Sequence, residues 1–365
     1  MADQNRLSSL DLIRGVAVLG ILPANLATFL GAPVAGATPA DRAAESLVLL
    51  VISMKMMTTL SILFGAGLAV QEAARRPGDG FPLRYFWRQS LLFLLGVAHG
   101  VLIWFGDILA SYACVGTLAM ILLLLGPGWA RAVLIAGLAW FYLVSAVILA
   151  VVLAFPGLGQ QESERPPLSP DGPPLPLLSG KGPLEEQVAD YFSDGNQARI
   201  HRHGTFAQRT ANRALVFSVV LLTMPFLFGW YVLGCFLIGT RLVRAGFFHD
   251  PEKRRPLARR FLALGVGIGL PLHVAGALLH WFYPTWPLPG LLNVFGALPQ
   301  ALLYLALLMA WDASGAWPWL QERLRAVGRM ALTNYLMQSV LFVALFDGLG
   351  WYGSVGLAAG TGLVA

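Results

Sequence analysis

The sequence predicts an all-α protein that crosses a membrane many times, a polytopic bundle of transmembrane helices. Of its 365 residues, 57% are apolar and only 12% are charged, whereas a soluble domain carries about 25% charged residues. The apolar residues form runs spread over most of the chain, and a helix needs about 20 such residues to cross the hydrocarbon core. This distribution argues against a soluble enzyme with a single anchor.

The apolar runs predict about nine complete spans and part of a tenth. The predicted spans are residues 10–30, 46–70, 89–105, 107–126, 131–155, 214–242, 261–283, 291–311 and 330–347. The last run begins near Trp351 and stops at Ala365, which is short for a crossing, so we expect the sequence to be truncated. Pro225 predicts a kink in the sixth span, because proline removes a main-chain hydrogen-bond donor.

A hydrophilic segment at 157–211 separates two groups of predicted helices, residues 1–156 and residues 212–365. The first half of this segment is rich in proline and glycine, which is typical of an extended linker. Its second half, Leu184 to Thr210, predicts an amphipathic helix that ends in arginine and histidine residues.

Basic residues predict the orientation of the bundle. They give the chain a formal charge of +6 and gather in the loops at 75–88, 241–260 and 323–329, whereas residues 284–290 carry no charge. Cytoplasmic loops carry an excess of Lys and Arg, so we expect these loops and the N-terminus in the cytoplasm and 157–211 outside. Basic loops between spans suit contacts with anionic membrane lipid rather than with nucleic acid.

The residue types that hold metals or phosphates form no recognised pattern. Cys114 and Cys235 both lie inside apolar runs, so neither a disulfide nor a metal site is predicted from them. The chain has no glycine-rich phosphate loop, nucleotide motif or set of metal ligands. We therefore expect no metal cofactor.

Polar residues inside the predicted spans indicate a site, because an ionisable group in hydrocarbon costs about 2.5–3.5 kcal/mol on insertion scales. On the predicted topology, Asn25, Lys55, His99 and Asp107 all lie in the outer half of the membrane. His99 and Asp107 flank one tight hairpin, where a carboxylate can orient an imidazole and raise its basicity. The sequence predicts His99 as a general base oriented by Asp107, with Lys55 or Asn25 stabilising an oxyanion.

Structural interpretations of these residues stay open at this point. Lys55 could extend its side chain to place the ammonium group at the membrane surface, and Asp107 could only cap the next helix. His273 suits a hydrogen bond between helices. His280, beside Trp281, suits the interfacial aromatic belt.

Four segments of the chain resemble one family. They are Leu10-Asp11-Leu12-Ile13-Arg14-Gly15 with Asn25, the run from Leu60 to Gly67, the run from Gly96 to Ala113 and the block from Gly328 to Ser339. In this order they resemble YeiB-type bacterial membrane proteins (domain of unknown function 418) over nearly the whole chain. That family is similar to a wider group of transmembrane acyltransferases, which includes the heparan-glucosaminide acetyltransferase and the acyltransferase-3 proteins.

The resemblance implies an acyltransferase in the bacterial cytoplasmic (inner) membrane. Its donor would be cytoplasmic acetyl-CoA or another acyl-CoA, and its acceptor a sugar or envelope component on the far side. In the lysosomal heparan-glucosaminide acetyltransferase, the catalytic histidine is expected soon after the first span. Residues 31–45 of this chain contain no histidine, so the catalytic role is assigned to His99 by its position. The implied substrate-binding residues are Asn25, Lys55, Asp11, Arg14, Arg329, Asn334 and Gln338.

Two rival functions and one ambiguity follow from the same residues. A transporter or flippase for a small or lipid-linked molecule also uses buried charges and broken helices, although no inverted repeat is visible in the sequence. A non-enzymatic membrane scaffold could act through residues 157–211. Arg14 could meet donor phosphates or only pair with Asp11, one helical turn away.

Overall fold

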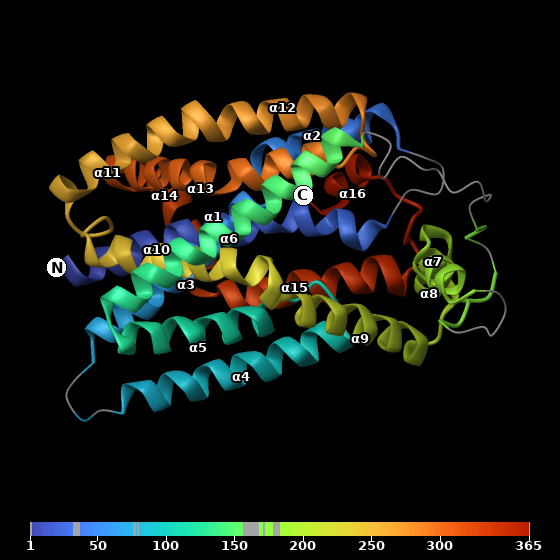
Figure 1. Cartoon of the computed structure of the whole chain (residues 1–365), viewed down its shortest axis with the longest axis horizontal. Coiled ribbons are helices and arrows are strands. Elements are labelled where there is room, and N and C mark those ends of the chain that lie inside the picture. The colour runs from blue at the N-terminus through green and yellow to red at the C-terminus, as the bar shows by residue number, and fades with distance from the viewer. Residues whose placement is uncertain are drawn as a thin grey trace.

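The computed structural model describes residues 2–31, 37–75, 78, 80–155, 168–170, 172–177 and 183–364, and every regular element in these ranges is helical (Figure 1). The all-α prediction is therefore confirmed for the described chain. The α-helices are α1 (Ala2–Leu30), α2 (Pro39–Val51), α3 (Lys55–Ala73), α4 (Phe81–Leu102), α5 (Leu109–Leu125), α6 (Pro127–Ala154), α7 (Leu184–Phe192), α8 (Asp194–His203), α9 (Phe206–Thr223), α10 (Phe228–Arg244), α11 (Pro251–Leu264), α12 (Leu270–Phe282), α13 (Leu288–Ser314), α14 (Pro318–Arg329), α15 (Ala331–Phe342) and α16 (Leu357–Val364). A 3₁₀ turn, η1 (Met224–Phe226), and two π-helical turns, η2 (Gly265–Gly269) and η3 (Val343–Gly348), join some of them.

The protein is a multi-pass membrane protein by the length and hydropathy of its helices. Five helical stretches of the described chain are long and apolar enough to cross a bilayer: Ser8–Leu30, Pro39–Ala73, Pro127–Ala154, Pro251–Phe282 and Leu288–Ser314. Two bent pairs raise the number to seven if each pair is one span, α9 with α10 at 64° and α14 with α15 at 81°. The other two predicted spans coincide with α4, of 22 residues, and α5, of 17. The run after Trp351 contains the eight-residue α16.

Two predicted details of the helices have different outcomes. The kink at Pro225 is confirmed, because this proline lies in η1, at the 64° bend between α9 and α10. The single amphipathic helix over 184–210 is wrong, because α7, α8 and the start of α9 occupy this range. The Ser193 hydroxyl caps α8 by accepting from the Asn196 amide at 3.3 Å, and Thr205 forms a capping box with Gln208 at the start of α9. Capping side chains satisfy the free amides of a new helix and so stabilise these breaks.

Glycines hold two pairs of helices in close contact. A Cβ atom on Gly65 of α3 would overlap the Phe236 carbonyl of α10, and one on Gly239 would overlap the Ile62 carbonyl. In the same way, Gly15 of α1 meets the Leu324 carbonyl of α14. Small residues let membrane helices approach until their backbones touch. The glycines in two of the family-like segments therefore fix how α3 packs on α10 and α1 on α14.

Gly65→Ala is expected to lower the free energy of unfolding by about 1–3 kcal/mol, as overpacking a tight contact does. Gly67→Ala is the matched control on the same helix, because a Cβ atom there meets nothing within 4 Å. The control should leave stability unchanged or raise it by up to about 1 kcal/mol, because alanine is the better helix former. Thermal unfolding in detergent measures both, and equal behaviour of the two variants would contradict the close contact.

The bundle has two distinct ends. The N-terminus, the end of α3, the start of α4, and α11 lie at one end, which we call the basic end (Figure 1). The α7 and α8 helices lie at the opposite end, the α7–α8 end (Figure 1). The arginines of α14 join the basic end, because Arg325 contacts Asp312 at the close of α13 at 2.5 Å. The predicted basic loops thus gather at one end, except that Arg76 lies outside the described residues.

Candidate functional site

The predicted pair of His99 and Asp107 forms a buried hydrogen-bonded dyad. His99 lies in the last turn of α4, and its Nδ1 atom is 3.0 Å from Oδ1 of Asp107. The two side chains are 1% and 0% exposed. The other carboxylate oxygen, Oδ2, accepts from the Ala110 amide at 2.9 Å. Asp107 therefore has both of the structural roles predicted for it, because it holds the imidazole and caps α5.

Glycines beside His99 explain how the dyad closes. A Cβ atom on Gly96 would overlap the main-chain nitrogen of Ala110, and one on Gly100 would overlap the Phe217 ring of α9. The absence of these methyl groups lets α5 and α9 press against α4 on either side of the histidine. The carboxylate of Asp107 is thereby brought within hydrogen-bonding distance of the imidazole.

The second ring nitrogen of His99 is available for chemistry. Nε2 is buried and has no hydrogen-bond partner among the described residues. Because Nδ1 faces a carboxylate, which only accepts hydrogen bonds when ionised, the neutral ring carries its proton on Nδ1. Nε2 then keeps a free lone pair, the arrangement that a general base requires.

A large cavity approaches the dyad from the basic end. It has a volume of about 540 Å³ and is lined by side chains of α1, α3, α4, α5, α14 and α15. Its polar lining residues are Arg14, Gln71, Tyr85, Arg88, Gln89, Arg329 and Tyr335. Most of the other lining residues are aliphatic, and we call this space the arginine cavity. Sites for small molecules typically have this size and this mixture of apolar wall and few polar groups.

A smaller cavity also borders Tyr335. It has a volume of about 140 Å³, and its lining includes Asn25, Trp104, Ile108 and Tyr335. Ile21, Ile108 and Tyr335 line both cavities. The rings of Tyr335 and Trp104 pack against His99, with centroids 5.3 and 6.5 Å away. Tyr335 thus contacts His99 and lines both cavities, whereas His99 and Asp107 line neither. We call the second space the Asn25 cavity.

Lys55 belongs to a different polar cluster. Its Nζ atom donates to the Leu49 carbonyl, to the Ser53 carbonyl at 3.1 Å and to Oδ1 of Asn293 at 3.0 Å. The same Asn293 oxygen is 2.9 Å from Nε2 of His273. Lys55 is 0% exposed, which excludes the interpretation that its ammonium group reaches the membrane surface. The residue therefore links the break between α2 and α3 to α13, and its charged group is bonded away from His99.

The remaining predicted residues divide between the arginine cavity and helix packing. Arg14 lines the cavity and also pairs with Asp11 at 2.7 Å, so the predicted i,i+3 ion pair is confirmed. Arg329 lines the cavity and has no hydrogen-bond or ion-pair partner within the described chain. Asn334 donates to the Val327 carbonyl at 3.0 Å across the bend between α14 and α15. Gln338 donates weakly to α1, and its Oε1 atom is buried without a partner among residues the structure describes.

The two other membrane histidines both find partners. His273 bonds to the Gly269 carbonyl at 2.6 Å as well as to α13, which confirms its predicted role between helices. His280 lies 3.0 Å from Glu45 in the middle of α2, a partner that the aromatic-belt interpretation did not foresee.

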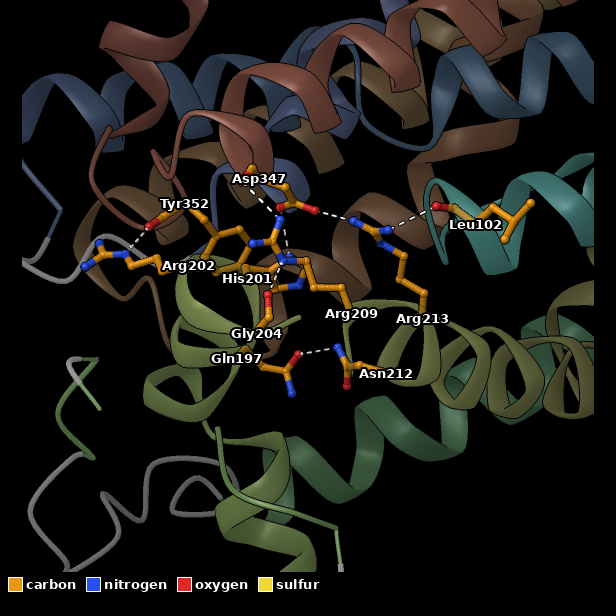
Figure 2. A network of polar contacts seen from close by, with 10 residues as sticks. All are labelled: Leu102, Gln197, His201, Arg202, Gly204, Arg209, Asn212, Arg213, Asp347 and Tyr352. Carbon is orange, nitrogen blue, oxygen red and sulfur yellow. Dashed lines mark hydrogen bonds and ion pairs between the residues drawn. The ribbon is translucent and has the colours of Figure 1, made fainter. Parts of the chain in front are cut away.

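A buried ionic cluster at the α7–α8 end escaped the sequence interpretation. Asp347 of η3 pairs with Arg213 of α9, and its Oδ1 atom lies 2.9 Å from Nδ1 of His201 (Figure 2). Arg213 also donates to the Leu102 carbonyl at 3.0 Å, three residues beyond His99 on α4. His201 stacks on Tyr352 with centroids 4.2 Å apart (Figure 2). The only sequence signal was a carboxylate at the end of an apolar run.

Across the residues that the structure describes, no group of three or more His, Cys, Asp or Glu side chains could hold a metal ion. Tyr335 and Trp104 were also overlooked as site residues. Tyr335 lies inside the Gly328–Ser339 segment that carried the family resemblance, so a phenol within that segment was the available signal.

Comparisons with known proteins agree with the resemblance seen in the sequence. The family described as "Protein of unknown function (DUF418)" matches residues 242–365. The chain is 32% identical to "Uncharacterized protein YeiB" of Escherichia coli (strain K12) over 94% of this chain and 84% of that protein. It is 28% identical to "Uncharacterized protein YxaH" of Bacillus subtilis (strain 168) over 97% of this chain and 85% of that protein. No solved structure matches it. The chain therefore belongs to the YeiB-type family of membrane proteins, domain of unknown function 418.

Proposed function

We propose that the protein is an acyltransferase of the bacterial cytoplasmic membrane, which moves an acyl group from a cytoplasmic CoA-type donor to an acceptor on the outer side. The observation that carries this proposal is the buried, unpartnered Nε2 atom of His99. An imidazole oriented by a carboxylate, with its second nitrogen free and its ring packed on a tyrosine that lines two cavities, suits proton transfer to and from a reacting group.

The arginine cavity supports the placement of the donor. Arg14, Arg88 and Arg329 would meet the phosphates, because guanidinium groups bind phosphate through paired, charge-assisted hydrogen bonds. The acyl end would point along the apolar wall toward Tyr335. The reactive carbonyl would then lie beside the dyad rather than at the cytoplasmic surface.

The Asn25 cavity supports the placement of the acceptor. A hydroxyl or amine there would give its proton to Nε2 of His99 while its oxygen or nitrogen attacks the thioester carbonyl. When the carbon–sulfur bond breaks, the imidazolium returns the proton to the leaving thiolate. The indole N–H of Trp104 is buried and has no partner within the described residues, so it and the Asn25 amide replace Lys55 as donors to the oxyanion.

Incubation of the purified, reconstituted protein with acyl-CoA labelled in the acyl group tests this function. Acyl transfer to the protein or to an added acceptor, or release of free CoA above that from empty vesicles, supports it. An absence of all three with both acetyl-CoA and long-chain acyl-CoA would overturn it.

The proposed orientation places the basic end in the cytoplasm and the α7–α8 end outside. Arg255 of α11 and Glu185 of α7 are exposed positions at the two ends. In a Cys114→Ala background, an impermeant thiol reagent added to intact cells should label Glu185→Cys and leave Arg255→Cys unlabelled. Cys235 is buried and serves as the internal blank. The reverse pattern would overturn the orientation.

A transporter or flippase is the second candidate, and a specific observation favours it. The bend of 81° between α14 and α15 borders the arginine cavity through Gly328, Arg329 and Ala331. Broken helices beside a substrate site are typical of secondary transporters. Uptake of a substrate that survives loss of His99 would favour this class over the enzyme.

A further inference from the structure

The arginine cavity is bordered by side chains that are also exposed. Leu91 and Leu95 of α4 and Leu332 of α15 line the cavity, and they are 65%, 36% and 42% exposed. α4 packs mainly along α5 and α9, so its face toward α1 and α15 borders the cavity instead of a neighbouring helix. In a membrane-spanning bundle, exposed leucines at this depth face lipid tails. The cavity therefore has a side that is open to the bilayer.

The charged groups of this cavity lie in one part of it. Arg88 donates to Gln71 at 2.7 Å, and Arg14 lies on the adjacent part of α1. Leu91 and Leu95 follow Arg88 by three and seven residues, which is about 4–10 Å along a helix. Beyond them the wall is apolar as far as Tyr335. The charges thus lie toward the basic end and the apolar wall runs toward the dyad.

The dimensions of the cavity exceed what an acetyl group needs. Its α3 wall extends from Gln71 to Leu60, eleven residues or about 16 Å at 1.5 Å per residue. A short acyl group would leave most of this apolar wall unoccupied. Each methylene group that the wall buries tightens binding about fourfold.

We infer that the arginine cavity binds a long-chain amphiphile with a phosphate-bearing head, in which the head contacts Arg14, Arg88 and Arg329 and the chain lies along the leucine wall. The inference rests on the proposed function only in assuming that this cavity is the binding site of the acyl donor. It specifies that donor as a long-chain acyl group rather than an acetyl group. The same chemistry is found in a long-chain acyl-CoA and in an anionic phospholipid of the inner leaflet. The open side lets a chain enter from the bilayer while the head stays at the basic end.

Binding to the protein in phosphatidylcholine nanodiscs tests the inference, with empty nanodiscs subtracted. Palmitoyl-CoA should bind at least tenfold more tightly than CoA or acetyl-CoA. Leu91→Trp should remove most of this preference without changing the affinity for CoA. Leu94→Trp is the matched control, because Leu94 is 63% exposed on the same helix and does not line the cavity.

The head site is tested separately from the chain site. Arg88→Gln together with Arg329→Gln should weaken palmitoyl-CoA and CoA alike, by about tenfold, whereas Arg255→Gln should weaken neither. The binding of palmitoyl-CoA is then measured with the protein in nanodiscs that contain phosphatidylglycerol. If this lipid displaces palmitoyl-CoA, the site belongs to bilayer lipid, and if it does not, the site belongs to acyl-CoA. Either result supports an amphiphile site.

Two outcomes separate this inference from the proposed function. If palmitoyl-CoA binds as described but is never consumed, the site stands and the acyltransferase proposal fails. If acetyl-CoA is consumed and palmitoyl-CoA binds no better than CoA, or if Leu91→Trp and Leu94→Trp behave alike, the long-chain inference is overturned and the enzyme stands.

Discussion

Replacing His99 with alanine is expected to reduce acyl transfer by about 10²–10⁴-fold, the usual contribution of a general base. The variant should still fold and bind donor, because the arginines that would contact the phosphates lie on other parts of α1, α4 and α14. Loss of the imidazole removes Nε2, a buried nitrogen that has no hydrogen-bond partner within the described chain. The measurement is the single-turnover rate with labelled acyl-CoA.

Asp107→Asn separates orientation from proton transfer. An amide has one acceptor oxygen for the two donors, His99 Nδ1 and the Ala110 amide, and it cannot stabilise the imidazolium that forms when Nε2 takes a proton. We expect a smaller loss than for His99→Ala. Arg14→Ala should instead weaken donor binding and leave the rate at saturating donor nearly unchanged. Full activity of His99→Ala would contradict the mechanism and favour the transporter.

The positions of the long apolar helices were predictable because hydrophobic length is a local property. Each of the nine predicted runs coincides with a helix or with a bent pair of helices. α14 was missed because Glu322, Arg323 and Arg325 make it read as a loop, yet it packs along α1 through Gly15 and Gly328. An amphipathic helix buried by tertiary contact has no signal in a search for apolar runs.

The dyad was predictable because its two members are eight residues apart across one turn. Lys55 and Asn293 are 238 residues apart, and Arg213 and Asp347 are 134 apart. The predicted depth grouped Lys55 with His99, but depth does not say which face of the bundle a side chain occupies. Only the packing of α3 against α13 directs Lys55 to its own cluster.

Arg213→Met is expected to destabilise the protein by about 3 kcal/mol, near the lower end of the range for removing one partner of a buried ion pair. The side chains of Arg213 and Asp347 are 4% and 7% exposed, so the carboxylate left behind has no access to bulk water. His201 stays beside it and moderates the loss (Figure 2). The measurement is thermal unfolding, with hydrogen exchange over α8 and α9 to locate the change.

Two further variants test whether the loss of stability in Arg213→Met comes from the buried charge. Arg244→Met breaks the ion pair with Glu72, in which Arg244 is 43% exposed, and pairs of that kind contribute below about 1 kcal/mol. The double variant Arg213→Met with Asp347→Leu removes both buried charges, and it should recover much of the stability, because apolar replacement of a whole buried pair is often neutral. A double variant as unstable as the single one would mean that packing rather than charge controls this end.

The Arg213→Met variant also tests whether the α7–α8 end affects the position of the His99–Asp107 dyad. Arg213 holds the Leu102 carbonyl at the close of α4, the helix that carries His99. Without that bond the last turn of α4 is free to fray, and the imidazole loses part of its fixed position relative to Asp107. Arg213→Met should therefore lower the transfer rate more than Arg244→Met, at a temperature where both are folded. Equal rates in the two variants would confine the cluster to a structural role.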